Sequence, residues 1–177
     1  MKKVRIGILF GGRSGEHEVS LMSARSVLEA IDREKYEVAM IGITKDGQWI
    51  DGDDPLMVLE ACVGASGMGD GGASLGTSVQ HLFSQIMKGS IGSPDLDVIF
   101  SVLHGTFGED GTVQGLFELG DIAYVGAGVV GSAVGMDKGV FKAVMRGAGL
   151  PVLPAVVINR SEYELNPDAI IRSVLQE

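Results

Sequence analysis

Two short, almost uninterrupted apolar runs constrain the fold of this chain more than any other feature. The first run, Val4 to Phe10, is followed by two glycines, and the second, Leu96 to Leu103, is followed by His104. Strands that are buried on both faces have this composition, and they occur in parallel sheets with helices on both sides. The two runs therefore predict an α/β fold.

The segments around these runs fit the same fold class. Apolar residues recur at helical spacing from Glu16 to Ile31, and Tyr36 to Ile43 is a second strand, with a hairpin turn predicted at Asp46-Gly47. A strand, a helix and a strand at this spacing indicate a βαβ unit and a parallel sheet. The glycine-rich stretch from Gly64 to Gly76 predicts a loop. Later elements are expected at Val113–Leu119 (helix), Ile122–Val125 (strand), after the N-cap Asp137 (helix) and after Asn166-Pro167 (helix).

Charge and composition exclude several classes of protein. The 177 residues carry a formal net charge of -9 and show no basic cluster, so neither nucleic acid nor an anionic membrane is expected as a partner. No stretch approaches the roughly 20 apolar residues of a membrane helix. The single cysteine, Cys62, allows no internal disulfide and no cysteine-based zinc site, and no metal site is expected. We expect a soluble, cytoplasmic protein.

Two sequence motifs match known patterns without the context that those patterns need. Gly126 to Gly131 fits G-x-G-x-x-G, but it follows a late strand and has no acidic residue about 20 positions further on. Gly72 to Gly76 fits G-x-S-x-G, but no strand precedes it. Neither dinucleotide binding nor serine hydrolysis is therefore predicted.

The stretch from Phe10 to Ser20, "FGGRSGEHEVS", combines a strand end, a glycine turn and a helix start. Glycines let backbone N–H groups approach a ligand, and a helix N-terminus favours negative charge. Glu16 at that position suits the ammonium group of a zwitterion. The alternative is that Glu16 and Glu18 only complement the helix dipole.

The stretch from His104 to Gly115, "HGTFGEDGTVQG", places a histidine and two acids at the next strand end. Ligands of open α/β sheets bind outside the carboxyl ends of the strands, so His104 and Glu16 are expected to line one crevice if their strands are neighbours. Glu109 or Asp110 would fix the tautomer of the imidazole. The alternative is that these acids cap the following helix.

Together the two stretches closely resemble the N-terminal signatures of the D-alanine–D-alanine ligases, enzymes of the ATP-grasp superfamily. "YVGAGVVGSAVGMDK" and "GAGLPVLPAVVI" resemble later blocks of that family in the same order. The resemblance implies a Rossmann-like N-terminal domain over residues 1–126 and the incomplete beginning of the ATP-grasp central domain over residues 127–177.

The resemblance also implies a reaction and roles. The family joins two D-alanines for peptidoglycan precursor synthesis through an acyl phosphate, using ATP and magnesium. Glu16 would anchor the ammonium of the first D-alanine, Val19 would lie near its methyl group, and His104 would contact the same substrate with Glu109 as its orienting partner. Lys138 would reach an ATP phosphate. Glu16 and His104 are thus the expected catalytic residues.

Other parts of the family's active site have no counterpart in this chain. These are the glycine-rich phosphate loop, its serine, the substrate tyrosine, the oxyanion arginine and the magnesium carboxylates. We therefore expect a truncated ligase that is inactive alone and needs the C-terminal part of the enzyme, and that pairs with the missing part or forms a homodimer. The alternatives are another ATP-dependent carboxylate–amine ligase and a non-catalytic module that binds a D-amino acid or a partner chain.

Overall fold

The computed structural model describes residues 2–50, 54–64 and 96–176, and the chain divides into two compact units, Met1–Met136 and Asp137–Glu177. The boundary expected after residue 126 falls before helix α5 (Val129–Met136). In the structure α5 belongs to the first unit, where it contacts helix α4 (Thr112–Leu119). The second unit therefore begins at Asp137.

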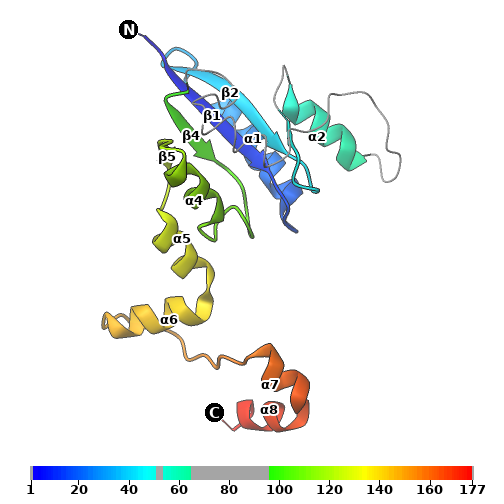
Figure 1. Cartoon of the computed structure of the whole chain (residues 1–177), viewed down its shortest axis with the longest axis vertical. Coiled ribbons are helices and arrows are strands. Elements are labelled where there is room, and N and C mark those ends of the chain that lie inside the picture. Colours follow the sequence, from blue (N-terminus) through cyan, green and yellow to red (C-terminus); the bar gives the residue numbers. More distant parts are fainter. Residues whose placement is uncertain (1, 51–53, 65–95, 177) are drawn as a thin grey trace. The chain divides into compact units, whose positions relative to one another are not determined.

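The first unit contains a five-stranded sheet in the order β3-β2-β1-β4-β5 (Figure 1). Strand β1 lies at the centre and pairs in parallel with β2 and β4, while β3 is antiparallel to β2 after the turn at Gly47. The predicted α/β fold with a parallel sheet is confirmed. The strands span Val4–Gly11 (β1), Tyr36–Ile43 (β2), Trp49–Ile50 (β3), Val98–Ser101 (β4) and Tyr124–Val125 (β5).

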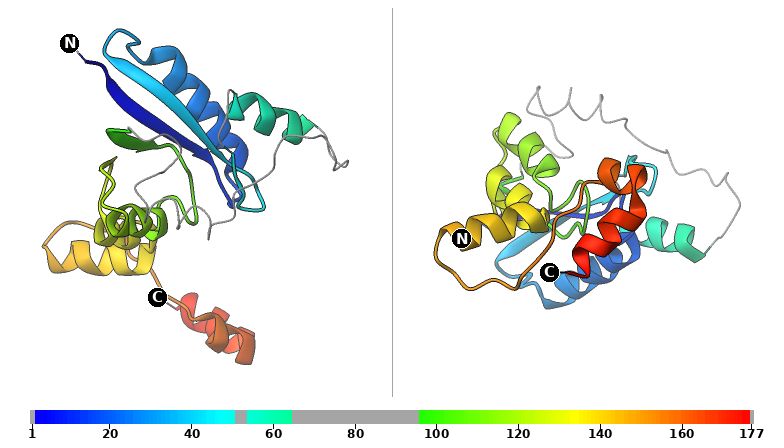
Figure 2. Two further views of the ribbon diagram at one scale, coloured as in Figure 1. Left: turned by 45° about the horizontal axis from the view of Figure 1, so that its top comes forward. Right: turned by 90° about the horizontal axis from the view of Figure 1, so that it is seen from below.

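Helices cover both faces of this sheet (Figure 2). On one face, Ile8 and Phe10 of β1 pack in a buried cluster with α1 (His17–Ala30) and α2 (Pro55–Gly64). On the other face, Leu9 belongs to a cluster with Phe117 of α4. Successive β1 side chains thus point to opposite buried faces, which explains why the run from Ile6 to Phe10 carries no polar side chain on either face.

The second unit contains three helices in its described residues: α6 (Lys138–Gly147), α7 (Arg160–Leu165) and α8 (Pro167–Val174). The two predicted N-caps are confirmed, because the Asp137 side chain accepts a hydrogen bond from Val140 N and the Asn166 side chain accepts one from Ala169 N. Helices α2, α5 and α7 were not expected from the sequence.

One stretch singled out in the sequence is not described by the structure. Apart from Gly64, the glycine-rich stretch and its G-x-S-x-G match lie outside the described residues. Within the described ranges, no helix combines the length and the apolar character needed to cross a bilayer.

Candidate functional site

The candidate site lies where β1 and β4 end side by side. The chain leaves β1 toward β2 on one side and later enters β4 on the other side, so a topological switch point lies between β1 and β4. Open α/β sheets bind their ligands at this point. Both polar stretches singled out in the sequence start here, which confirms that their strands are neighbours.

The turn after β1 requires glycine. Gly11 has φ +89°, and a Cβ atom there would lie 2.2 Å from the carbonyl oxygen of Ile43. Gly12 N donates a hydrogen bond of 2.8 Å to the same oxygen. The chain can turn this closely against β2 only without a side chain, because an L-residue is strained at positive φ.

Two buried polar side chains of α1 hold this turn in place. Ser20 Oγ accepts a hydrogen bond from Gly11 N at 2.8 Å and donates to the Val102 carbonyl oxygen at 2.7 Å. His17 is 2% exposed, and its Nδ1–H donates to the Gly12 carbonyl oxygen over 2.9 Å. Ser20 therefore joins the ends of both strands to the helix, and His17 has a structural role.

The two glutamates at the start of α1 have different surroundings. Glu18 forms an ion pair with Lys45, and the hydrogen bond from Lys45 lowers the pKa of the Glu18 carboxyl. The Glu16 carboxylate forms no hydrogen bond or ion pair with any described residue, and it lies against Gly105, where a Cβ atom would be 2.6 Å from Glu16 Oε2. Glu18 thus has a partner in Lys45, whereas Glu16 has a carboxylate available to a ligand.

His104 is half-buried and is held by α1 rather than by its own loop. Its Nε2 atom lies 2.9 Å from Ser23 Oγ. The second ring nitrogen, Nδ1, has no hydrogen-bond partner in the part of the chain that the structure describes. The contact with Ser23 was not expected, because no local motif relates residues so far apart in sequence.

The expectation that Glu109 or Asp110 orients the imidazole differs from the structure. Glu109 Oε2 accepts a hydrogen bond of 2.7 Å from Gly105 N. Asp110 accepts from Phe107 N at 2.9 Å and from Thr112 N at 3.0 Å, at the start of α4. Both oxygens of Asp110 and one oxygen of Glu109 thus accept from backbone N–H groups of their own loop, and Asp110 fits the helix-capping alternative.

The charge of Asp110 is favoured by these bonds. Burial acts to raise the pKa of the Asp110 carboxyl, but the hydrogen bonds from Phe107 and Thr112 outweigh it, and the pKa is lowered. One of the donors, Phe107, has φ 67°, which is unusual for an aromatic residue. The guanidinium of Arg13 lies 5.6 Å from the centre of the Phe107 ring. Asp110 and Arg13 thus stabilise a strained residue.

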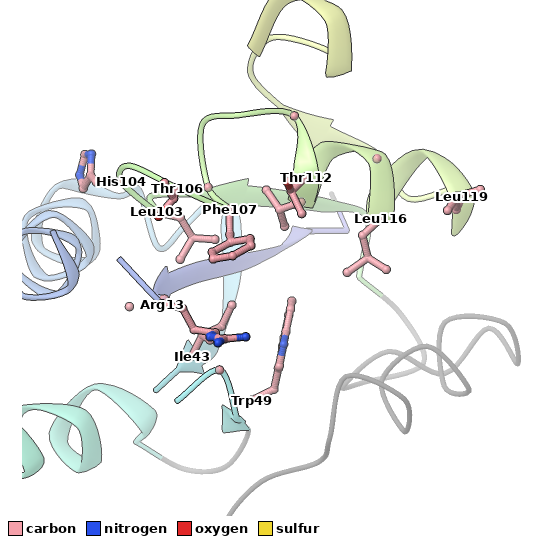
Figure 3. Close-up of a pocket in the computed structure, with 17 residues that line it drawn as sticks. Arg13, Ile43, Trp49, Leu103, His104, Thr106, Phe107, Thr112, Leu116 and Leu119 are labelled. Carbon is pink, nitrogen blue, oxygen red and sulfur yellow. The ribbon is translucent and has the colours of Figure 1, made fainter. Parts of the chain in front are cut away.

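A cavity of about 730 Å³ lies beside the site, on the α4 face of the sheet (Figure 3). Its walls are mainly apolar, with Trp49, Phe107 and Leu116 among them, and none of its lining residues comes from α1. His104 is at its border, and the figure shows the ring directed toward α1 and away from Phe107 and Leu116. Glu16, Val19 and Glu109 do not line it.

The other expected site residues lie in separate places. Val19 is in the first turn of α1 and 49% exposed, on the same helix face as Glu16. Lys138 is the first residue of α6 and belongs to the second unit. Among the described residues no three His, Cys, Asp or Glu side chains are grouped closely enough to hold a metal ion together.

A mostly parallel sheet with a carboxylate and a histidine at its switch point places this unit in the class of open α/β domains, whose ligands bind at that position. The family model described as "D-ala D-ala ligase N-terminus" matches residues 5–127. The chain is 49% identical over 174 residues to the D-alanine–D-alanine ligase of Natranaerobius thermophilus, a match that covers 98% of this chain and 47% of the relative. The chain belongs to the D-alanine–D-alanine ligase family.

Solved structures agree with this assignment. The VanG D-Ala:D-Ser ligase from Enterococcus faecalis has a TM-score of 0.71 at 33% identity, covering 99% of this chain and 50% of that chain. The D-alanine-D-alanine ligase from Coxiella burnetii has a TM-score of 0.69 at 30% identity, covering 99% and 49%. The chain thus spans about half the length of the relatives that it matches.

Proposed function

We propose that this chain is the part of a D-alanine–D-alanine ligase that binds the first D-alanine. Glu16 binds the ammonium group, Val19 lies beside the methyl group, and His104 contacts the carboxylate. One observation carries the proposal: Glu16 and Glu18 stand two residues apart, yet only the carboxylate of Glu18 has a partner among the described residues. A carboxylate without a partner, beside the histidine loop, suits an amino-acid ammonium.

The start of α1 supports the same ligand. The first N–H groups of a helix have no acceptor within the helix, and they favour negative charge nearby. A zwitterion therefore finds an acceptor in Glu16 and N–H donors in the first turn of α1. Glu109 acts indirectly in this proposal, since it holds Gly105 N and with it the loop that carries His104.

The remaining functions belong to the part of the enzyme beyond this chain. ATP with magnesium supplies the activation of the substrate carboxylate, and Lys138 is the one residue here that we assign to the nucleotide. The second substrate is D-alanine, and the product serves peptidoglycan precursor synthesis in the cytoplasm. D-serine is the second candidate for that substrate, because one structural relative is a D-Ala:D-Ser ligase. A homodimer remains a prediction.

Replacing Glu16 tests the proposal, with Glu18 as the matched control. In a full-length ligase that contains this chain, Glu16→Gln is expected to raise KM for the first D-alanine about 30- to 700-fold. The reason is that losing one charge of a desolvated ion pair costs roughly 2–4 kcal/mol. Glu18→Gln removes the same charge from the same helix turn and should change KM little. Equal effects of the two variants would mean that both glutamates act through the helix dipole alone.

A further inference from the structure

We infer that Ser23 holds His104 in the tautomer with the proton on Nδ1, so that the ring acts toward its ligand as a hydrogen-bond donor and not as a base. The identity of the ligand, the first D-alanine, rests on the proposed function. The assignment of the tautomer depends only on the hydrogen bonds of Ser23 and Ser26.

The contact between Ser23 and His104 comes from one face of α1. Glu16, Ser20 and Ser23 follow one another at helical spacing, so they share this face. Ser20 bonds to Val102 and Ser23 to His104, while Glu16 lies against Gly105. The helix face thus runs along the chain as it leaves β4.

The hydroxyl proton of Ser23 decides the tautomer. A helical serine commonly donates to the carbonyl group four residues earlier, as Ser26 does to the Met22 oxygen at 3.1 Å. Ser23 makes no such bond among the described residues, and its one partner there is His104 Nε2. If Nε2 carried the ring proton, it would donate to Ser23 Oγ and leave the hydroxyl proton without an acceptor among the described residues.

The other arrangement uses both groups. If Ser23 O–H donates to Nε2, the neutral ring carries its proton on Nδ1, because a neutral imidazole has one N–H and one acceptor nitrogen. That Nδ1–H has no acceptor in the described ranges. The nearby Glu16 carboxylate likewise has no hydrogen-bond donor there. The pair offers one donor and one acceptor, which complements the carboxylate and the ammonium of an amino acid.

The tautomer can be measured on the 177-residue chain without any ligand. Two-bond ¹H–¹⁵N correlation spectra of chain labelled at histidine, recorded at about pH 8.5 where an unperturbed imidazole is neutral, separate the two N–H forms. His104→Gln identifies the His104 signals. We expect the Nδ1–H pattern in the wild type and in Ser26→Ala, its loss in Ser23→Ala, and its return in Ser23→Thr, which keeps the hydroxyl.

Two results would overturn the inference. One is an Nε2–H pattern in the wild type, which decides the matter even if a variant fails to fold. The other is an unchanged His104 pattern in Ser23→Ala when its backbone amide spectrum shows an intact fold.

Steady-state kinetics of a full-length ligase that contains this chain separate this inference from the proposed function. Ser23→Ala should raise KM for the first D-alanine about tenfold, the value of one hydrogen bond, and Ser23→Thr should restore it. A changed tautomer with unchanged kinetics would support the role of Ser23 and count against the assignment of His104 to substrate. Changed kinetics with an unchanged tautomer would overturn the role of Ser23.

Discussion

At the scale of single residues, the site depends on the missing side chain of Gly105 as much as on the side chains around it. Gly105 has φ +72°, and Glu16 Oε2 lies where its Cβ atom would be, with Ser14 also close. The glycine therefore serves two purposes: it allows the left-handed turn after His104, and it leaves room for the Glu16 carboxylate.

Gly105→Ala should destabilise the chain, and Gly115→Ala provides the control. Alanine at position 105 costs about 1–2 kcal/mol for the left-handed backbone, and it also displaces Glu16. Gly115 lies inside α4 with nothing within 4 Å of its Cβ position, so alanine there should stabilise the helix by about 0.5–1 kcal/mol. Urea unfolding of both variants measures the difference. Equal stability of the two would contradict the steric argument at Gly105.

The sequence allowed some residues of the candidate site to be predicted and not others. Glu16 and His104 follow the ends of two apolar strands, so topology alone places them at one edge. Ser23 is an ordinary helical serine in the sequence, and its contact with His104 depends on how α1 packs beside β4. The expected link from Glu109 to His104 is not among the contacts of the described residues, where Glu109 Oε2 accepts a hydrogen bond from Gly105 N.

At the scale of elements, the strands and the amphipathic helices were predictable, whereas three helices were not. Helix α2 is apolar almost throughout and shows no helical periodicity, and α5 contains two glycines. Helix α7 has six mainly polar residues. In each case tertiary contacts or chain connectivity, and not the local pattern, select the helix.

The loop before α4 should give the chain a specific pH dependence. The pKa of Asp110 is lowered in the folded state, so its contribution to stability is present above the ordinary pKa of about 4 and is lost as the pH falls through the folded value. Asp110→Asn should cost about 1–2 kcal/mol at pH 7, from weaker hydrogen bonds to Phe107 N and Thr112 N. That difference should shrink below about pH 4.

Asp121→Asn is the control for this loop. Asp121 is exposed and has φ 50°, a conformation that asparagine also tolerates, and its side chain makes no hydrogen bond among the described residues. Denaturant unfolding at several pH values compares the two variants. A destabilisation by Asp110→Asn that is the same at pH 3 and pH 7 would show that the carboxylate charge is not involved.

At the scale of the whole molecule, the two units differ in how much they bury. The first unit has a core on both faces of its sheet. In the second unit no described residue is buried, and large apolar side chains of α6 and α8 are exposed, including Val144, Ile171 and Val174. Burial of apolar surface supplies most of the stability of a folded domain, so the second unit lacks its main source of stability.

This difference predicts that α6 and α8 open easily and that ATP does not change this. A helix of ten residues or fewer is marginal in water unless its apolar face is packed. One lysine–phosphate contact at a surface contributes about 1 kcal/mol, against association costs of about 4–15 kcal/mol, so Lys138 alone should not hold the nucleotide.

Backbone hydrogen exchange of the 177-residue chain measures local opening directly. We expect the amides of Lys138–Gly147 and Pro167–Val174 to exchange much faster than those of Val4–Gly11 and Val98–Ser101, with or without ATP and magnesium. Protection of the two helices equal to that of the strands, or saturable protection on adding ATP, would show that the second unit is stable and binds nucleotide without the rest of the enzyme.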